Sequence, residues 1–351
     1  MESLSTESEA NGSILTMHLR VYQHTMADFP SSLGVSSALG VGTWAWGNRL
    51  LWGYEPGQDQ QLRATFERAV ALGLCFFDTA DSYGTGRFNG RSETLLGRFC
   101  SALPPGKRHE LCVATKLAPF PWRLGRGGFN RALAASRARL QGHLDRVQLH
   151  WSTARYAPWQ EKPLLDGLAD QVLAGGVPEL GVSNMGPRRL RFFHQHLASR
   201  GVALKSLQVQ FSLLAPEPIS SGGVAAVCRE LGIQLIAYSP LALGLLARSP
   251  GAEQPQGLRR SLFRRLEPQL QPLRELVASV GAARGAPPAA VALNWCRAHG
   301  AMPIPGLRTP DHVETAVAAL GWDLSPSERE QLDAQALAIP RRMPANPFQS
   351  A

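Results

Sequence analysis

The sequence predicts an α/β fold, a (β/α)8 TIM barrel with a parallel eight-stranded sheet, on three observations. Eight short apolar runs alternate with helical patterns along the chain. Polar side chains stand at the ends of successive runs, and in such a barrel all strands end at one mouth. No G-x-G-x-x-G follows the first run and no P-loop occurs, which disfavours an open, doubly wound nucleotide-binding sheet.

The strands are expected where short apolar runs lie between polar or glycine-rich segments. These runs cover residues 39–43, 75–77, 111–115, 147–149, 179–182, 207–209, 235–237 and 302–304. Helices are expected between them, and two of these have clear ends. One spans residues 59–72, with Asp59 as N-cap and Gly73 just past its C-terminus. Another begins with Ser325 as N-cap and Glu328 at the third helical position, which is a capping box.

The composition is that of a folded protein with a large core. Hydrophobic residues make up 44% of the 351 residues and charged residues 18%, which excludes a mostly disordered chain. The five cysteines are scattered and lack C-x-x-C spacing, so we expect a reducing compartment and no structural zinc. His194 and His196 would point to different faces of a helix, so no metal is expected there either. No apolar run approaches the roughly 20 residues that cross a bilayer, so we expect a soluble intracellular protein without a membrane partner.

The formal net charge of +9 comes almost entirely from arginine, because the chain has lysine only at positions 107, 116, 162 and 205. A GC-rich genome explains most of these arginines, and an anionic ligand is the functional alternative. Nucleic acid is not expected, because no binding motif appears and no stacking aromatics alternate with the arginines. Residues 1–30 are polar, with three glutamates and, histidines aside, Arg20 as the one basic residue. They are unlike a transit or signal peptide and are expected to form a flexible tail before a domain of residues 31–351.

Four polar residues at three consecutive strand ends carry the clearest chemical signal. Residues 76–84 run from a strand into a polar loop that delivers Asp78 and Tyr83, and the next two strands end in Lys116 and His150. A buried lysine needs a carboxylate partner, and Asp78 lies on the neighbouring strand. An unperturbed tyrosine titrates near 10 and keeps its proton at neutral pH, and we expect a nearby lysine to lower that pKa. Such a tyrosine is suited to protonate the oxygen of a carbonyl that accepts a hydride.

Each of the four has a simpler explanation when taken alone, as a surface charge, a core histidine or a helix cap. Together, with the spacing D-T-A-x-x-Y, they resemble the catalytic tetrad of the aldo-keto reductases. The resemblance runs from about residue 33 to the C-terminus, and residues 39–47, 181–184, 237–241 and 304–306 carry further family motifs. It implies a barrel that binds NADPH and reduces a carbonyl group of a small-molecule substrate.

The resemblance also implies which residues bind the cofactor. Ser183, Asn184 and Gln208 would hold the nicotinamide carboxamide, Tyr238 would stack on its ring, and Arg308 would pair with the 2′-phosphate. The remaining candidates lie along the pyrophosphate or near the two ends of the cofactor: Thr43, Trp44, Ser239, Leu241, Arg259, Arg264, Gly306 and His312.

The adenine end departs from the family pattern. Many relatives place a glutamine and then a glutamate-asparagine pair after the Ile-Pro-Gly segment. Here those positions hold His312, Thr315 and Ala316, and an alanine side chain cannot form a hydrogen bond with adenine. The sequence therefore predicts a weaker affinity for NADPH than is usual in the family.

A narrower resemblance is to the plant-type pyridoxal reductases, carried by residues 42–48, 81–90, 121–124, 149–153, 208–214 and 346–349. It implies reduction of pyridoxal to pyridoxine, and a plastid location that the N-terminal residues do not support. Trp44, Trp122 and Trp151 are candidates to line the pocket and stack on a planar aldehyde, or else serve only in packing. A broad-specificity aldehyde or ketone reductase and an NADPH-binding redox sensor like the potassium-channel β-subunits remain alternatives. We expect a monomer or a weak homo-oligomer.

Overall fold

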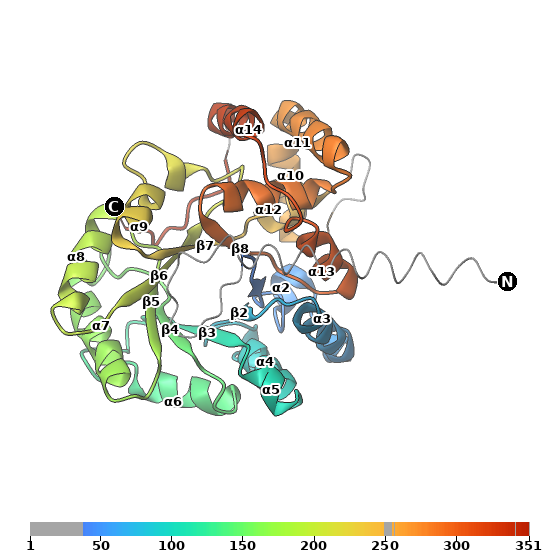
Figure 1. Cartoon of the computed structure of the whole chain (residues 1–351). Helices are drawn as coiled ribbons and strands as arrows, with labels where there is room; N and C mark the ends of the chain where they lie inside the picture. Colours follow the sequence, from blue (N-terminus) through green and yellow to red (C-terminus); the bar gives the residue numbers. More distant parts are fainter. Residues whose placement is uncertain (1–37, 249–254, 256, 341, 351) are drawn as a thin grey trace.

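The computed structural model describes residues 38–248, 255, 257–340 and 342–350. Eight parallel strands pair in sequence order from β1 to β8, and the last segment returns to the first. The closure is made by a bridge between Gly42 and Gly306 and by the amide of Gly40, which donates to Pro303 at 3.0 Å. Figure 1 shows the strands as a ring with the helices outside it. The prediction of a (β/α)8 barrel is confirmed, whereas the tail expected over residues 1–30 lies outside the described residues.

All eight predicted strands are present, with ends that shift by one to three residues. They are β1 Val41–Gly42, β2 Phe76–Asp78, β3 Cys112–Leu117, β4 Arg146–Leu149, β5 Glu179–Ser183, β6 Leu204–Gln210, β7 Gln234–Tyr238 and β8 Ala301–Ile304. The polar residues expected just after the strands are in several cases still part of them. Asp78 pairs with Ala114 and Lys116 with Gln148 in the sheet, so the backbone of the site is held by strand hydrogen bonds.

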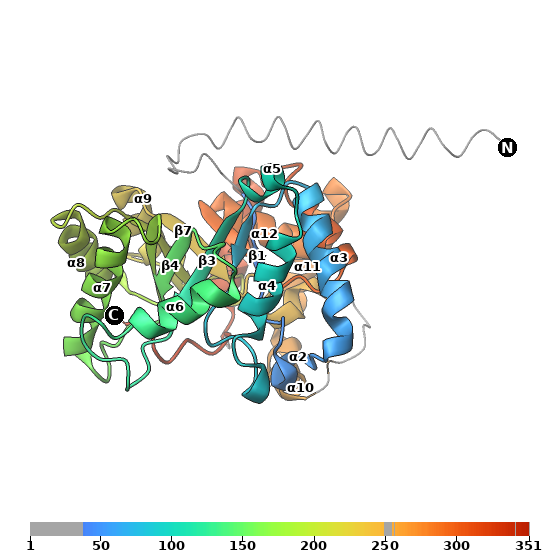
Figure 2. The same cartoon turned by 90° about the horizontal axis from the view of Figure 1, so that it is seen from below.

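Helices cover the outside of the barrel between successive strands (Figure 2). They are α2 Arg49–Trp52, α3 Asp59–Ala71, α4 Arg91–Ser101, α5 Pro105–Arg108, α6 Asn130–Arg139, α7 Pro158–Leu173, α8 Pro187–Ala198, α9 Val224–Leu231, α10 Leu258–Leu266, α11 Gln271–Arg284, α12 Pro288–Ala298, α13 Pro310–Val317 and α14 Pro326–Ala338. Among the described residues no single helix is long and apolar enough to cross a membrane. The pair α11 and α12 meets the length and composition criteria only together, across a bend of 94°.

The helix ends follow local side-chain chemistry, with one correction. Ser325 and Glu328 form the predicted capping box of α14, and Gly73 ends α3 with a φ of +80°. Asp59 is not the N-cap of α3, because a 3-10 turn precedes the helix and makes Asp59 its first residue. Its carboxylate instead accepts from the hydroxyl of Tyr54 at 2.6 Å and pairs with Arg91.

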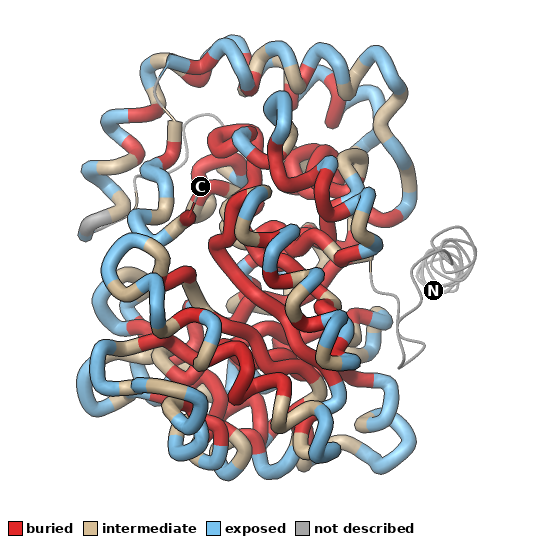
Figure 3. Tube along the Cα trace, turned by 90° about the vertical axis from the view of Figure 1, so that its left-hand side faces the viewer, coloured by how far each residue is buried: buried red, intermediate tan, exposed pale blue. Residues whose placement is uncertain are grey.

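Two apolar layers position the site. The outer layer lies between strands and helices, and Figure 3 shows that buried residues fill the centre of the molecule. The inner layer fills the barrel with the side chains of Phe76, Cys112, Ala114, Ile236, Met302 and Ile304. Side chains two residues apart on a strand share a face, so Asp78 follows Phe76 and Lys116 follows Ala114 on the inner face. The polar residues therefore stand directly above an apolar plug, at the C-terminal mouth.

Candidate active site

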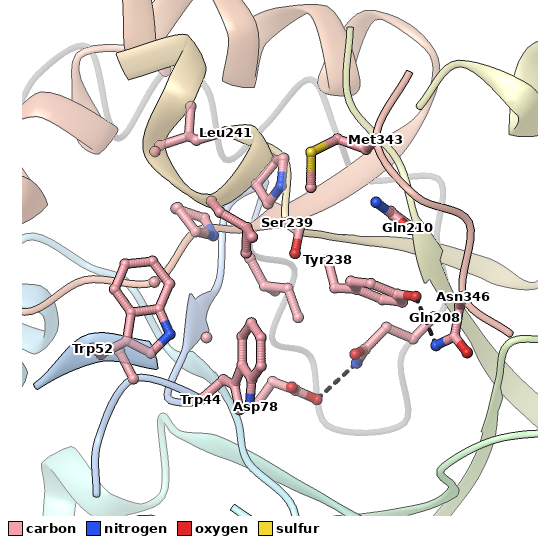
Figure 4. Close-up of a pocket in the computed structure, with 18 of the residues that line it drawn as sticks. Trp44, Trp52, Asp78, Gln208, Gln210, Tyr238, Ser239, Leu241, Met343 and Asn346 are labelled. Atoms are coloured by element: carbon pink, nitrogen blue, oxygen red, sulfur yellow. Dashed lines mark hydrogen bonds between the residues drawn. The ribbon is translucent and has the colours of Figure 1, made fainter. Parts of the chain in front are cut away.

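A cavity of about 790 Å³ opens at the C-terminal ends of the strands, a size typical of ligand sites. It brings together all four predicted catalytic residues and most of the predicted cofactor residues. The predicted residues that line it are Asp78, Tyr83, Lys116, His150, Trp44, Trp151, Ser183, Asn184, Gln208, Tyr238, Ser239, Leu241, Arg259, Gly306, Arg308 and His312. Figure 4 shows part of this lining, with Trp44, Asp78, Gln208 and Tyr238 turned toward the same space.

A fully buried ion pair lies at the floor of the cavity. The ammonium group of Lys116 contacts Asp78 and donates to the carbonyl of Thr79 at 2.8 Å. The other carboxylate oxygen of Asp78 accepts from the amides of Gln148 at 3.1 Å and Gln208 at 2.7 Å. Burial lowers the pKa of Lys116 and the carboxylate of Asp78 opposes that shift. The pair therefore has its charges and hydrogen bonds satisfied within the protein, as a buried pair requires.

Tyr83 lies next to this pair and to His150. The ammonium nitrogen of Lys116 is 4.8 Å from the centre of the Tyr83 ring, and the centre of the His150 ring is 5.7 Å away on another side. The pKa of Tyr83 is raised well above its usual value by burial and by the carboxylates of Asp78 and Asp81. The expected lowering of this pKa by Lys116 is therefore not found, because burial has the largest effect on the pKa and the two carboxylates add to it. Tyr83 consequently keeps its proton, which makes it a donor and not a base.

His150 is neutral in this setting. Burial, and then the charge of Lys116, lower the pKa of its imidazole well below the usual value. Its Nδ1 lies 3.4 Å from the hydroxyl of Ser82, and its backbone carbonyl accepts from the side-chain amide of Asn184 at 3.0 Å. A neutral imidazole carries one N–H, so His150 can donate a hydrogen bond to a ligand oxygen without carrying charge.

Hydroxyl and amide groups at the ends of β5, β6 and β7 are connected by hydrogen bonds. Ser183 donates to the backbone carbonyl of Gln208 at 2.9 Å and accepts from the amide of Asn184 at 3.0 Å. Tyr238 donates to the side-chain oxygen of Asn184 at 2.9 Å. Asn184 has a φ of +57°, a left-handed conformation that asparagine tolerates better than most residues. The strand ends thus fix these polar groups before any ligand arrives.

Two arginines, Arg259 and Arg308, line the opposite end of the cavity. Burial, and then the charges of Arg308 and Arg248, lower the pKa of Arg259. Among the described residues neither Arg259 nor Arg308 pairs with a carboxylate, whereas Arg248 bonds with Glu267 at 2.7 Å. Such an uncompensated cationic end is suited to an anionic ligand such as a phosphate.

Comparison with known proteins agrees with this geometry. The model of the aldo/keto reductase family matches residues 38–336. The chain belongs to the aldo/keto reductase family. It is 48% identical to the chloroplastic pyridoxal reductase of Arabidopsis thaliana, over 90% of this chain and 87% of that one. It is also 35% identical to an uncharacterized oxidoreductase of Mycobacterium tuberculosis, over 88% of this chain and 91% of that one.

Solved structures give the same assignment. An aldo/keto reductase from Klebsiella pneumoniae in complex with NADP and acetate matches with a TM-score of 0.64 and 26% identity, over 90% of this chain and 95% of that one. A thermostable aldo-keto reductase in complex with the inhibitor epalrestat matches with a TM-score of 0.68 and 23% identity, over 86% of this chain and 95% of that one. The second likeness supports the fold alone. This aldo/keto reductase is therefore an oxidoreductase built on a TIM barrel.

Three predicted residues lie outside the lining of the cavity. Thr43 is buried, and its hydroxyl donates to the carbonyl of Asp78 at 2.9 Å and bonds with Ser92 at 2.7 Å. Its one O–H is therefore donated within the protein, where it ties the segment after β1 to β2. Trp122 is 73% exposed and stacks on Phe120 with ring centres 4.8 Å apart, so it belongs to the outer surface. Arg264 is exposed on α10 and does not reach the cavity.

Some of the residues that line the cavity were not predicted from the sequence. Residues 343–348 near the C-terminus line the cavity, and the amide of Asn346 donates to the hydroxyl of Tyr238 at 3.1 Å (Figure 4). The ring of Phe348 stacks on Trp151 with centres 5.0 Å apart. Trp52, on α2, also lines the cavity and was not predicted. Within the described part of the chain no group of three or more histidine, cysteine or acidic side chains is placed to hold a metal, and His196 bonds with Asp166 at 2.7 Å.

Proposed function

We propose that this enzyme reduces an aldehyde to an alcohol with NADPH, and that its substrate is pyridoxal. The observation that carries the proposal is the position of Tyr83, which keeps its proton while it lies against the Lys116–Asp78 pair and a neutral His150. Acid catalysis of this kind typically contributes a factor of about 10² to 10⁴. The family and the named relative support the same reaction.

The residues present fit NADPH. Arg259 and Arg308 form a cationic end without a carboxylate partner among the described residues, which suits the phosphates. At the other end, the amide nitrogen of Gln208 is used by Asp78, which leaves its amide oxygen to accept from a carboxamide. Tyr238 presents its ring to the same space. The Klebsiella pneumoniae reductase solved with NADPH supports this assignment. NADPH, when bound, would supply the hydride to the carbonyl carbon.

The protein supplies the proton and holds the carbonyl. Tyr83 donates its proton to the carbonyl oxygen as that oxygen gains negative charge, and the new O–H bond completes the alcohol. Lys116, 4.8 Å from the ring, stabilises the tyrosinate that remains, and Asp78 keeps the lysine in place. His150 donates its N–H to the same carbonyl oxygen and orients the substrate.

The choice of pyridoxal has two supports. One is the 48% identity to a protein named as pyridoxal reductase. The other is an aromatic wall of the cavity made by Trp44, Trp151 and Phe348, which suits a planar ring. Since the relative is named as chloroplastic, a plastid location accompanies this proposal and a fluorescent fusion in plant cells would test it. We also propose that the enzyme acts as a monomer or weak homo-oligomer.

The substrate is tested by steady-state oxidation of NADPH with pyridoxal, benzaldehyde and pyridine-4-carbaldehyde. A dedicated pyridoxal reductase shows kcat/KM for pyridoxal at least about tenfold above the other two, because benzaldehyde and pyridine-4-carbaldehyde lack the ring hydroxyl and hydroxymethyl groups by which such an enzyme would recognise pyridoxal. Values within about threefold of one another would instead indicate a broad-specificity reductase. A single turnover without a steady state would contradict the enzymatic role and favour a redox sensor.

A further inference from the structure

Trp52 lies on the connection between β1 and α3 and lines the cavity. It ends α2, a short helix capped by the side chain of Asn48, which accepts from the amide of Leu51 at 3.0 Å. The helix stops at Gly53, whose φ of +63° gives the left-handed turn that ends it. Figure 4 shows the indole at the edge of the cavity beside Trp44, and the two ring centres are 6.3 Å apart.

Two guanidinium groups lie over the ring of Trp52. The central carbon of Arg259 is 4.4 Å from the ring centre and that of Arg308 is 5.2 Å from it. Arg308 also donates to the backbone carbonyl of Trp52 at 3.2 Å. The three residues come from α2, α10 and the segment after β8, and Figure 2 shows α2 and α10 at the same end of the barrel. The indole therefore contacts two cations that come from distant segments of the chain.

The cluster of Trp52, Arg259 and Arg308 carries two positive charges, and no carboxylate among the described residues pairs with them. Arg308 contributes to lowering the pKa of Arg259, so the two cations repel each other. The Nε of Arg259 and the indole nitrogen of Trp52 are buried without a hydrogen-bond partner in the described part of the chain. The aromatic ring offsets part of the repulsion between these two like charges, and a bound anion would offset more of it.

Position 316 on α13 cannot contribute to this recognition. Ala316 lines the cavity and is buried without any side-chain donor or acceptor. The glutamate-asparagine pair of many relatives is therefore absent, and His312 and Thr315 are the polar residues of α13 that remain in the lining. Recognition of a 2′-phosphate would then depend mainly on the two guanidinium groups and on the contacts that keep them in place.

We propose that Trp52 is a positioning residue that makes this enzyme select a 2′-phosphorylated cofactor, by holding Arg259 and Arg308 together as a two-arginine clamp. The proposal rests on the proposed use of NADPH and names the determinant of that preference. Loss of the ring would remove the contact that the two guanidinium groups share, and their mutual repulsion would then favour a wider separation. The affinity for the 2′-phosphate would fall while contacts with the rest of the nucleotide would remain.

The test is isothermal titration of the full-length protein with adenosine 2′,5′-bisphosphate and with 5′-AMP, which lacks the 2′-phosphate. Trp52→Leu is expected to weaken binding of the bisphosphate at least about tenfold and to change binding of 5′-AMP by less than about twofold. Trp52→Phe keeps an aromatic face and should weaken the bisphosphate only about two- to fivefold. In kinetics, Trp52→Leu should raise KM for NADPH far more than it raises KM for NADH.

Trp322 offers a matched control, because the guanidinium of Arg284 lies 5.4 Å from its ring centre and neither residue lines the cavity. Trp322→Leu should leave both affinities unchanged. Equal weakening of both ligands by Trp52→Leu, or weakening of neither, would overturn the proposal. If Trp52→Leu does not fold, Trp52→Phe decides it, since no selective loss in that variant is also a contradiction. If the unaltered protein bound both ligands equally, the use of NADPH itself would be wrong, which is a separate failure.

Discussion

The two ends of the cavity differ in whether their positive charges are paired with a carboxylate. At the catalytic end Lys116 is paired with Asp78, and the second carboxylate oxygen accepts two amide hydrogen bonds. At the other end Arg259 and Arg308 share one aromatic ring, and no carboxylate among the described residues pairs with them. The catalytic end thus has its charges paired within the protein, whereas the arginine end has no carboxylate partner among the described residues. Removing a cation should therefore have opposite consequences for stability at the two ends.

Lys116→Met should give the larger effect. The substitution leaves the carboxylate of Asp78 buried without its cation, and breaking a buried pair in this way typically costs about 3–5 kcal/mol. Urea denaturation followed by circular dichroism measures the free energy of unfolding. A loss below about 1 kcal/mol would mean that the pair is not the completed unit described above.

Arg308→Met should leave the free energy of unfolding without ligand within about 1 kcal/mol, or raise it, because it removes a repulsion with Arg259. The same variant should lose at least about tenfold in affinity for NADPH, since the proposed contact of Arg308 with the 2′-phosphate would be lost. Urea denaturation, as for Lys116→Met, gives the free energy of unfolding, and isothermal titration with NADPH gives the affinity. Strong destabilisation of the ligand-free protein would show that the arginine end is also completed within the chain.

A smaller difference in catalytic efficiency is expected between a tryptophan in the wall of the cavity and one on the outer surface. Trp151 lines the cavity and stacks on Phe348, whereas Trp122 is largely exposed. Trp151→Leu should lower kcat/KM for pyridoxal about tenfold, and Trp122→Leu should change it by less than about twofold. Steady-state kinetics with both variants checks this. Equal effects would place Trp122 in substrate binding after all.

The smallest expected effect is that of pH on turnover. The pKa of Tyr83 is raised and that of His150 is lowered, so neither group titrates in the neutral range. The kcat for reduction should stay nearly constant from about pH 6.5 to about pH 9. The stability should fall as the pH drops below about 6.5, because the unfolded chain then binds a proton that the folded His150 does not take. A change in kcat with a midpoint near pH 7 would contradict these pKa directions.

The sequence predicted the barrel, and the position of Asp78 beside Lys116, because both depend on strand periodicity. Alternation along β2 and β3 places Asp78 and Lys116 on the inner face, and parallel strands end at one mouth. Trp52 and Asn346 lie on connections outside any repeating pattern, so only the three-dimensional path of the chain brings them to the cavity. For Trp122 the sequence shows an aromatic side chain, but it does not show that this side chain points to the outer surface. The direction of the Tyr83 pKa shift depends on Asp81 and on burial, which spacing does not reveal.

The central claim is that Tyr83 gives the proton while the rest of the site binds the cofactor without it. Its most direct test is Tyr83→Phe, with NADPH oxidation measured with pyridoxal and NADPH binding measured by quenching of tryptophan fluorescence. Turnover should fall by a factor of about 10² to 10⁴ and the dissociation constant of NADPH should stay within about threefold. Turnover within about tenfold of the unaltered enzyme, or a parallel loss of binding and turnover, would contradict the assignment.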